Sequence, residues 1–232
     1  MKKRTCVVGV AVLLAALLAM AGVAQSAMWV GAELGANFPA NSNITVNGFD
    51  TGGTAFHPTV IGGATIGYDF VNAGFGAYAW PDWMKYFTLL TDITYNKLQM
   101  ATGRDASGIG AFAPGGSQIE ASALAWTWML MAHYGFLPDS EIPTGRVNPY
   151  VGVGPAVVWT TLDGDTSGFS SATSTNIALV AEAGIRWMCF KQVSVDTAYR
   201  FRYLEPSWDA GNVTIKAPLY MHTFLVRANY HF

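Results

Sequence analysis

The last ten residues of the sequence, TFLVRANYHF (223–232), decide the fold. Every second side chain in this stretch is apolar or aromatic, at positions 224, 226, 228, 230 and 232. The side chains between them are mostly polar: Thr223, Arg227, Asn229 and His231, with Leu225 as the exception. A period of two is typical of a β-strand that has one apolar face and one polar face.

The other end of the sequence has the features of a secretory signal peptide. Three basic residues, Lys2, Lys3 and Arg4, precede an apolar run of 18 residues from Val7 to Ala24, and small residues follow. We expect residues 1–27 to be a cleaved signal peptide and residues 28–232 to form one domain. Cleavage after Ala24, Ser26 or Ala27 fits the pattern equally. The alternative is an uncleaved helix, since this run is just long enough to cross a bilayer.

Composition limits the function of the mature chain. The signal segment holds three of the 13 basic residues and none of the 15 acidic ones, which leaves 10 against 15 and a formal charge of −5. An acidic chain disfavours a nucleic-acid partner. Cys189 is the one cysteine that follows the signal segment, so we expect no intramolecular disulfide.

Alternation recurs along the whole mature sequence. We predict eight strands: Met28–Phe38, Thr59–Phe70, Lys85–Leu98, Ile119–Phe136, Pro149–Thr161, Asn176–Trp187, Val193–Leu204 and Leu219–Phe232. Each is at least as long as the roughly 9–11 tilted residues that cross a bilayer. Free strand edges cannot be satisfied in hydrocarbon, so the sheet must close. The sequence therefore predicts an all-β fold, an eight-stranded antiparallel transmembrane up-and-down β-barrel, with both termini on the periplasmic side.

The connections between these strands are expected to alternate. Three lie on the periplasmic side: Val71–Met84, Leu137–Asn148 and Cys189–Gln192. The remaining four are rich in Gly, Ser, Asn and Thr, and we predict them to be flexible external loops: Pro39–Pro58, Gln99–Gln118, Leu162–Thr175 and Glu205–Pro218.

The whole mature chain resembles the small eight-stranded outer-membrane barrels of the OmpA/OmpX type, as does the stretch PYVGVG (149–154). The resemblance implies a bacterial outer-membrane location, no peptidoglycan-binding domain, and contact with membrane lipid and lipopolysaccharide. It also implies that the barrel-assembly machinery reads a C-terminal signal, with periplasmic chaperones as earlier partners. We expect a monomer. The predicted assembly signal consists of Phe224, Val226, Tyr230 and Phe232.

Assigning the polar faces to the barrel interior predicts a lumen charge network. It comprises four acids and four arginines: Glu33, Asp92, Glu182, Asp196, Arg186, Arg200, Arg202 and Arg227. Eight strands enclose a space that side chains can fill, so we expect a plugged polar lumen. The alternative is a gated ion path or ligand-binding lumen. The fifth segment is apolar on both faces, and we assign Val151, Val153, Val157 and Trp159 outward.

No catalytic or metal-binding pattern stands out. The histidines are His57, His133, His222 and His231, and none has metal-ligand spacing or a neighbouring motif of the kind seen in barrel deacylases. Asp163-Gly164-Asp165 lacks the remaining ligands of a calcium loop. We therefore expect no cofactor and no enzymatic activity. Three functions remain open: a structural or surface-interaction barrel, a narrow channel or transporter for small or hydrophobic solutes, and a lipid A-modifying enzyme.

Overall fold

A computed structural model describes residues 28–54, 56–70, 80–100, 120–162, 171–210 and 213–232. The predicted signal peptide, residues 1–27, lies outside the described residues. Eight long strands form the body of the molecule: β1 (Met28–Pro39), β5 (Thr59–Asp69), β6 (Phe87–Met100), β7 (Glu120–His133), β8 (Val147–Leu162), β9 (Ala172–Phe190), β10 (Val193–Leu204) and β13 (Leu219–His231). Within the described ranges, no helix is long and apolar enough to cross a membrane.

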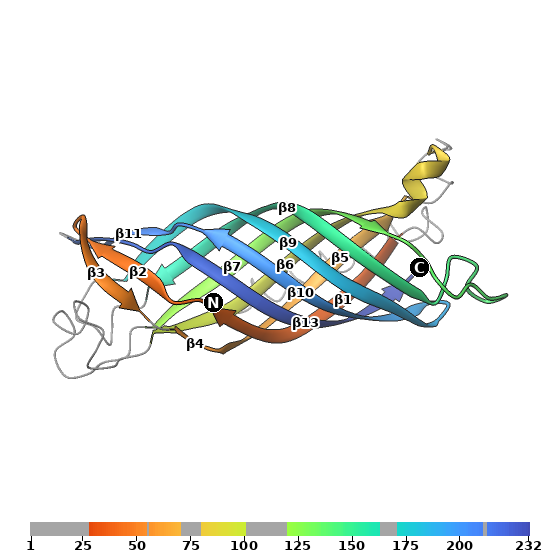
Figure 1. Ribbon diagram of the computed structural model, residues 1–232, viewed down its shortest axis with the longest axis horizontal. Coiled ribbons are helices and arrows are strands. Elements are labelled where there is room, and N and C mark those ends of the chain that lie inside the picture. The colour runs from red at the N-terminus through yellow and green to blue at the C-terminus, as the bar shows by residue number, and fades with distance from the viewer. Residues whose placement is uncertain (1–27, 55, 71–79, 101–119, 163–170, 211–212) are drawn as a thin grey trace, which may run out of the picture.

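These eight strands close into a barrel, as the sequence predicts. Each strand pairs antiparallel with its neighbour along the chain, and β1 closes the circle by pairing with β13 (Figure 1). Trp29 lies opposite His231, and the backbone N–H of Phe232 donates to the carbonyl of Met28 at 3.0 Å. The first and last described residues therefore lie at the same end of the barrel, which is what an even number of strands requires.

The predicted strand bounds shift by a few residues. β9 is longer than predicted, because its pairing with β8 begins at Ala172 and its pairing with β10 reaches Phe190. β6 starts at Phe87 instead of Lys85, because a short 3-10 helix, η2 (Asp82–Tyr86), precedes it. β7 ends at His133, and beyond it a single bridge joins Phe136 to Val147.

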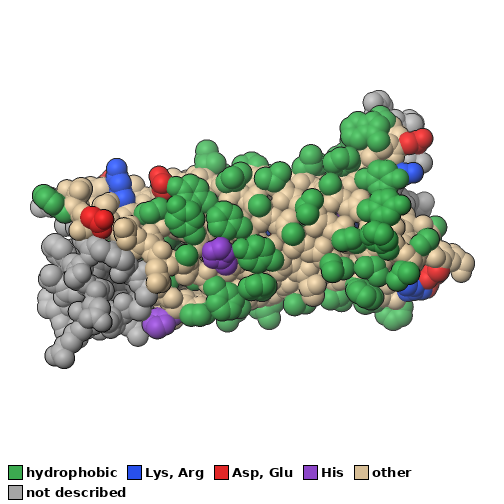
Figure 2. Space-filling view, viewed as in Figure 1, with side chains coloured by type: hydrophobic (Ala, Val, Ile, Leu, Met, Phe, Trp, Pro, Cys, Tyr) green, Lys and Arg blue, Asp and Glu red, His purple; other side chains and the backbone are tan. Residues whose placement is uncertain are grey.

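Side chains alternate between the inside and the outside of the barrel. Figure 2 shows hydrophobic side chains spread over the outer wall. The fifth predicted strand, β8, faces the way the sequence analysis assigned it: Val151 is 61% exposed and Val153 is 55% exposed, whereas Tyr150 is 4% exposed. Inside the barrel, Trp29 packs directly against Gly67, where an added Cβ would lie 2.0 Å from the indole ring. Only glycine fits beneath this buried ring.

Two of the predicted flexible loops instead form a second sheet. β2 (Ser42–Val46), β3 (Phe49–Thr54), β11 (Ser207–Ala210) and β12 (Val213–Lys216) pair in the order β11-β12-β2-β3. The prediction of irregular loops at 39–58 and 205–218 was wrong in these parts. Asn47-Gly48 joins β2 to β3 with positive φ at both residues, 51° and 83°, as a two-residue hairpin turn of type I′ requires.

The remaining predicted external loops are only partly described. Residues 101–119 and 163–170 lie outside the described residues. A further short strand, β4 (Phe56–His57), pairs with the end of β6.

The second sheet lies at the end of the barrel opposite the C-terminus (Figure 1). Ile44 of β2 and Trp208 of β11 are fully buried, and the Trp208 indole N–H donates to the Thr160 carbonyl of the barrel wall at 3.2 Å. Both side chains belong to an apolar cluster that fills this half of the barrel; its other members include Leu98, Ala123, Ala125, Ala156, Val158, Ala178, Val180, Leu204, Leu219 and Met221. The interior is therefore polar in only part of its length.

The connection between β7 and β8, at the C-terminal end of the barrel, is ordered by a small polar cluster. The Asp139 carboxylate accepts hydrogen bonds from the backbone N–H of Ile142 and from Arg146. These contacts lower the pKa of Asp139 and raise the pKa of Arg146. Gly145 turns the chain into β8 with a φ of +100°.

Candidate functional site

Residues of opposite charge lie side by side across four neighbouring strands. Glu33 of β1 is opposite Arg227 of β13, Arg227 is opposite Asp196 of β10, and Asp196 is opposite Arg186 of β9. All four side chains are buried inside the barrel. Opposite charges at paired positions of an antiparallel sheet stabilise it, and here the charges alternate from strand to strand.

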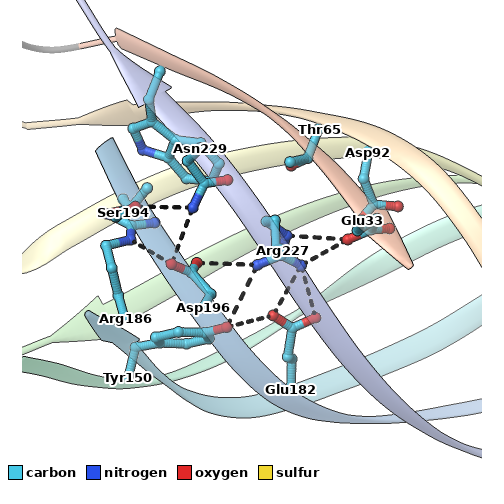
Figure 3. Close-up of polar contacts among 12 residues, drawn as sticks. Glu33, Thr65, Asp92, Tyr150, Glu182, Arg186, Ser194, Asp196, Arg227 and Asn229 are labelled. Atoms are coloured by element: carbon cyan, nitrogen blue, oxygen red, sulfur yellow. Dashed lines mark hydrogen bonds and ion pairs between the residues drawn. The ribbon is translucent and has the colours of Figure 1, made fainter. Parts of the chain in front are cut away.

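Arg227 makes the largest number of contacts in this row (Figure 3). Its Nη2 and Nε donate to Oε2 of Glu33 at 2.9 and 3.0 Å. Its Nη2 also lies 3.2 Å from Oε1 of Glu182, and its Nη1 lies 3.4 Å from both Oδ2 of Asp196 and the Tyr150 hydroxyl. One guanidinium thus bridges three carboxylates carried by three different strands.

Arg200 connects opposite walls of the lumen. Its Nε donates to Oε2 of Glu182 on the adjacent strand β9 at 2.7 Å. Its Nη2 donates at 2.7 Å to Oδ2 of Asp92 on β6, which does not neighbour β10 in the sheet. Its Nη1 lies 3.6 Å from Oε1 of Glu33. The guanidinium is 1% exposed, so these ion pairs form a crossbar through the barrel.

Arg186 extends the network toward the C-terminal end of the barrel and brings in a residue that the sequence analysis missed. Its Nε lies 3.4 Å from Oδ1 of Asp196, and its Nη1 lies 3.5 Å from Oδ1 of Asp69. The guanidinium also lies over the Trp29 ring, 4.4 Å from the centroid. The Asp69 carboxylate accepts a further hydrogen bond from Thr88 at 2.6 Å.

Arg202 is the member of the predicted set that the structure does not bring into an ion pair. In the described part of the chain no carboxylate lies within 4.0 Å of it, and its Nη2 donates to the Thr94 hydroxyl at 3.3 Å. The other seven predicted residues are all ion-paired. With Asp69 included, the interior holds five carboxylates and four guanidiniums, where the sequence analysis expected four of each.

Uncharged side chains complete the network, although they were not among its predicted members. The Tyr150 hydroxyl donates to Oε1 of Glu182 at 3.1 Å, and the Asn229 amide donates to Oδ1 of Asp196 and to the Ser194 hydroxyl, both at 3.0 Å. These residues carry no charge to draw attention to them. Their signal in the sequence is position alone, because Asn229 and Ser194 stand on the polar faces of predicted strands.

The four histidines are scattered over the barrel. His231 Nε2 lies 2.9 Å from the hydroxyl of Ser194, which is fully buried and already accepts from Asn229. His222 lies on the outer wall, hydrogen-bonded to Tyr199. His133 is half-buried and His57 is exposed. Among the described residues, no three His, Cys, Asp or Glu side chains form a group that could hold a metal ion. Asp163 and Asp165 lie outside the described residues.

The residues of the predicted assembly signal line the outer wall of β13. Phe224, Val226 and Tyr230 are all exposed, and the ring of Phe232 packs edge-on against that of Tyr230 with the centroids 5.4 Å apart. The four side chains therefore form one apolar strip along the seam where β13 closes onto β1.

The comparisons with known proteins agree with this architecture. A family model described as "Outer membrane protein beta-barrel domain" matches residues 10–232, so the chain belongs to this family and is a protein of the bacterial outer membrane. No curated protein matches it in sequence.

Solved structures show the same fold at low identity. The outer membrane protein OprG from Pseudomonas aeruginosa is 14% identical with a TM-score of 0.60, and the match covers 90% of this chain and 97% of that one. Neisserial surface protein A is 13% identical with a TM-score of 0.50, and the match covers 88% and 97% of the two chains.

Breaking the crossbar should destabilise the barrel strongly. We predict that Arg200→Met lowers the free energy of unfolding by about 3–5 kcal/mol, because it leaves Asp92 buried without its partner and leaves Glu182 with Arg227 alone. Urea unfolding in lipid vesicles measures this value. The matched control is Arg146→Met, which removes an exposed ion pair in a turn and should cost less than about 1 kcal/mol. Equal losses in the two variants would contradict the role assigned to Arg200.

Proposed function

We propose that the protein is a structural and surface-interaction barrel whose lumen is closed. The observation that carries this proposal is the set of buried ion pairs made by Arg200 and Arg227. These pairs link β1, β6, β9 and β10 through buried carboxylates. A close-packed lumen with paired charges has little room for a hydrated path. The apolar cluster around Ile44 and Trp208 supports a second closure, at the end that carries the extra sheet.

We propose that this extra sheet faces the cell exterior and that both termini face the periplasm, after removal of residues 1–27 as a signal peptide. Short turns on the periplasmic side and longer connections outside are the arrangement typical of these barrels. The sheet of β2, β3, β11 and β12 then presents exposed side chains to the surroundings, among them Phe49, which is 78% exposed. Its partners in this proposal are lipopolysaccharide and other molecules at the cell surface. The protein acts as a monomer and takes no nucleic-acid partner.

The lumen network favours this proposal over a channel, and conductance distinguishes the two. Purified protein inserted into planar bilayers should give no stepwise conductance at neutral pH, with insertion verified by the shift of the folded band on an unheated gel. Combining Arg200→Met with Arg227→Met should raise the leak of ions through the barrel, because the double variant loses both arginines whose ion pairs cross the lumen. Stable open steps in the unmodified protein would establish a channel and refute the closed lumen.

An enzymatic role has weaker support. The Ser194–His231 pair lies at the inner wall, with the Ser194 hydroxyl fully buried, so a membrane lipid has no direct route to it. We propose that the protein does not modify lipid A. An altered lipid A mass spectrum in cells that express the protein would refute this.

We also propose that the strip formed by Phe224, Val226, Tyr230 and Phe232 is the signal by which periplasmic chaperones and the barrel-assembly machinery recognise the chain. Deleting Phe232 should slow assembly in cells several-fold while lowering the unfolding free energy of the refolded barrel by no more than about 1.5 kcal/mol, because the residue supplies one backbone hydrogen bond to Met28 and one ring contact with Tyr230. Pulse-chase appearance of the folded band measures the rate. Deletion of Lys191 from the turn between β9 and β10 serves as a control for chain length, and an unchanged rate in the Phe232 deletion would contradict the signal.

A further inference from the structure

One polar pair of the outer wall joins β10 and β13. Tyr199 of β10 and His222 of β13 lie on adjacent strands, and the Tyr199 hydroxyl is 2.6 Å from Nδ1 of His222. Figure 2 shows a histidine side chain within the field of hydrophobic side chains on this face of the molecule. On β10 and β13, His222 is the one outward-facing residue with an ionisable nitrogen.

Aromatic rings from three strands surround this pair. Phe201 lies 5.5 Å from the His222 ring, and Phe224 lies 5.4 Å from the Tyr199 ring, between centroids. Phe38 of β1 packs edge-on against Phe224 at 6.0 Å. Phe38 and Phe224 are exposed, so their faces are free to contact a hydrocarbon chain beside the imidazole.

The pair lies near one rim of the apolar belt. The rings of Tyr220 and Tyr203 lie 5.0 Å apart between centroids, tilted by 32°, at the rim that carries the extra sheet, and His222 follows Tyr220 by two residues toward the middle of the barrel. With a strand rise of 3.3–3.4 Å per residue and the tilt usual for these barrels, His222 lies about 5 Å below that rim along the membrane normal. This depth lies near the boundary between the headgroup region and the hydrocarbon core of the bilayer.

The hydrogen bond to Tyr199 leaves one imidazole nitrogen for a ligand. A neutral imidazole has one donor and one acceptor nitrogen, so when the phenol donates to Nδ1, the proton lies on Nε2. In the described part of the chain Nε2 has no hydrogen-bond partner, and it is not a buried atom. A free N–H that faces hydrocarbon is costly, which favours a partner oxygen supplied by the lipid.

We propose that Tyr199 and His222 form a binding site for the glycolipid of the outer leaflet, the lipid A part of lipopolysaccharide. Nε2 of His222 donates to an acyl oxygen, and the Phe38, Phe201 and Phe224 rings pack along the acyl chain. The wall around the site is continuous with the lipid interface that every outer-membrane barrel has. The choice of glycolipid rests on the proposed orientation, in which this rim faces the outer leaflet.

Native mass spectrometry of the purified full-length protein in detergent micelles tests the site, with lipid A or phosphatidylethanolamine as the added probe. His222→Phe keeps an aromatic ring but removes the donor, and we expect about fivefold weaker retention of lipid A, the loss of one hydrogen bond. Phosphatidylethanolamine retention should not change. The control is Thr197→Val, which removes an outward hydroxyl from the same strand at a position opposite Val226 and should leave both lipids unaffected.

Three outcomes would overturn the site: equal lipid A retention by His222→Phe and the unmodified protein, equal loss of both lipids, or a dimer of the unmodified protein that His222→Phe dissociates. The last outcome would assign the wall to a second copy of the chain. Folded-band gels confirm that each variant is intact. Micelles expose the wall whatever the orientation in cells, so failure here is separate from failure of the proposed function. That function fails instead if protease added to whole cells cuts the turn at 137–146 and spares the extra sheet.

Discussion

The structure depends on one constraint: carboxylates placed inside an eight-stranded barrel must be paired with buried cations. Each buried arginine or carboxylate would be expensive without a partner, because the space is too narrow for bulk water. The row Glu33, Arg227, Asp196 and Arg186 meets this demand by placing alternating charges on four consecutive strands at paired positions. Arg200 then links this row to Asp92 across the lumen. The ion pairs therefore join β1, β6, β9, β10 and β13 across the lumen.

The same pairs fix the strand register. If β13 slipped by one residue against β10, Arg227 would turn toward lipid, Val226 would turn inward, and Asp196 would lose its contact with Arg227, so both faces of the strand would be wrong at once. The neutral packing agrees with this register. Trp29 lies over Gly67, and the Tyr150 ring lies over Gly184, where an added Cβ would be 2.6 Å from it. Electrostatic pairing and steric fit therefore select the same alignment.

The sequence was sufficient for the barrel because a period of two is visible in most of its strands, although β8 is apolar on both faces. Val226 and Arg227 show why: the apolar side chain fits only the lipid side of the wall, and the charged side chain fits only the lumen. The strands β2, β3, β11 and β12 were not predicted, because each is short and the segment 42–54 is rich in Thr and Gly. The Asn47-Gly48 turn was the available signal there. The sequence predicted most of the charged residues that face the lumen, but it did not predict which of them contact one another. Nothing in the spacing of residues 92 and 200 shows that they meet across the lumen, or that Arg202 lacks a carboxylate partner.

The central claim is that the buried charges stabilise the barrel by acting on one another. A double-mutant cycle on Glu33 and Arg227 tests it most directly, using Glu33→Gln, Arg227→Met and the combined variant, with unfolding followed in lipid vesicles. The two side chains meet at 2.9 Å, and close buried charge pairs give coupling energies of about 1.5 kcal/mol or more. We predict a coupling of at least that size. Losses that add to within about 0.5 kcal/mol would contradict the account.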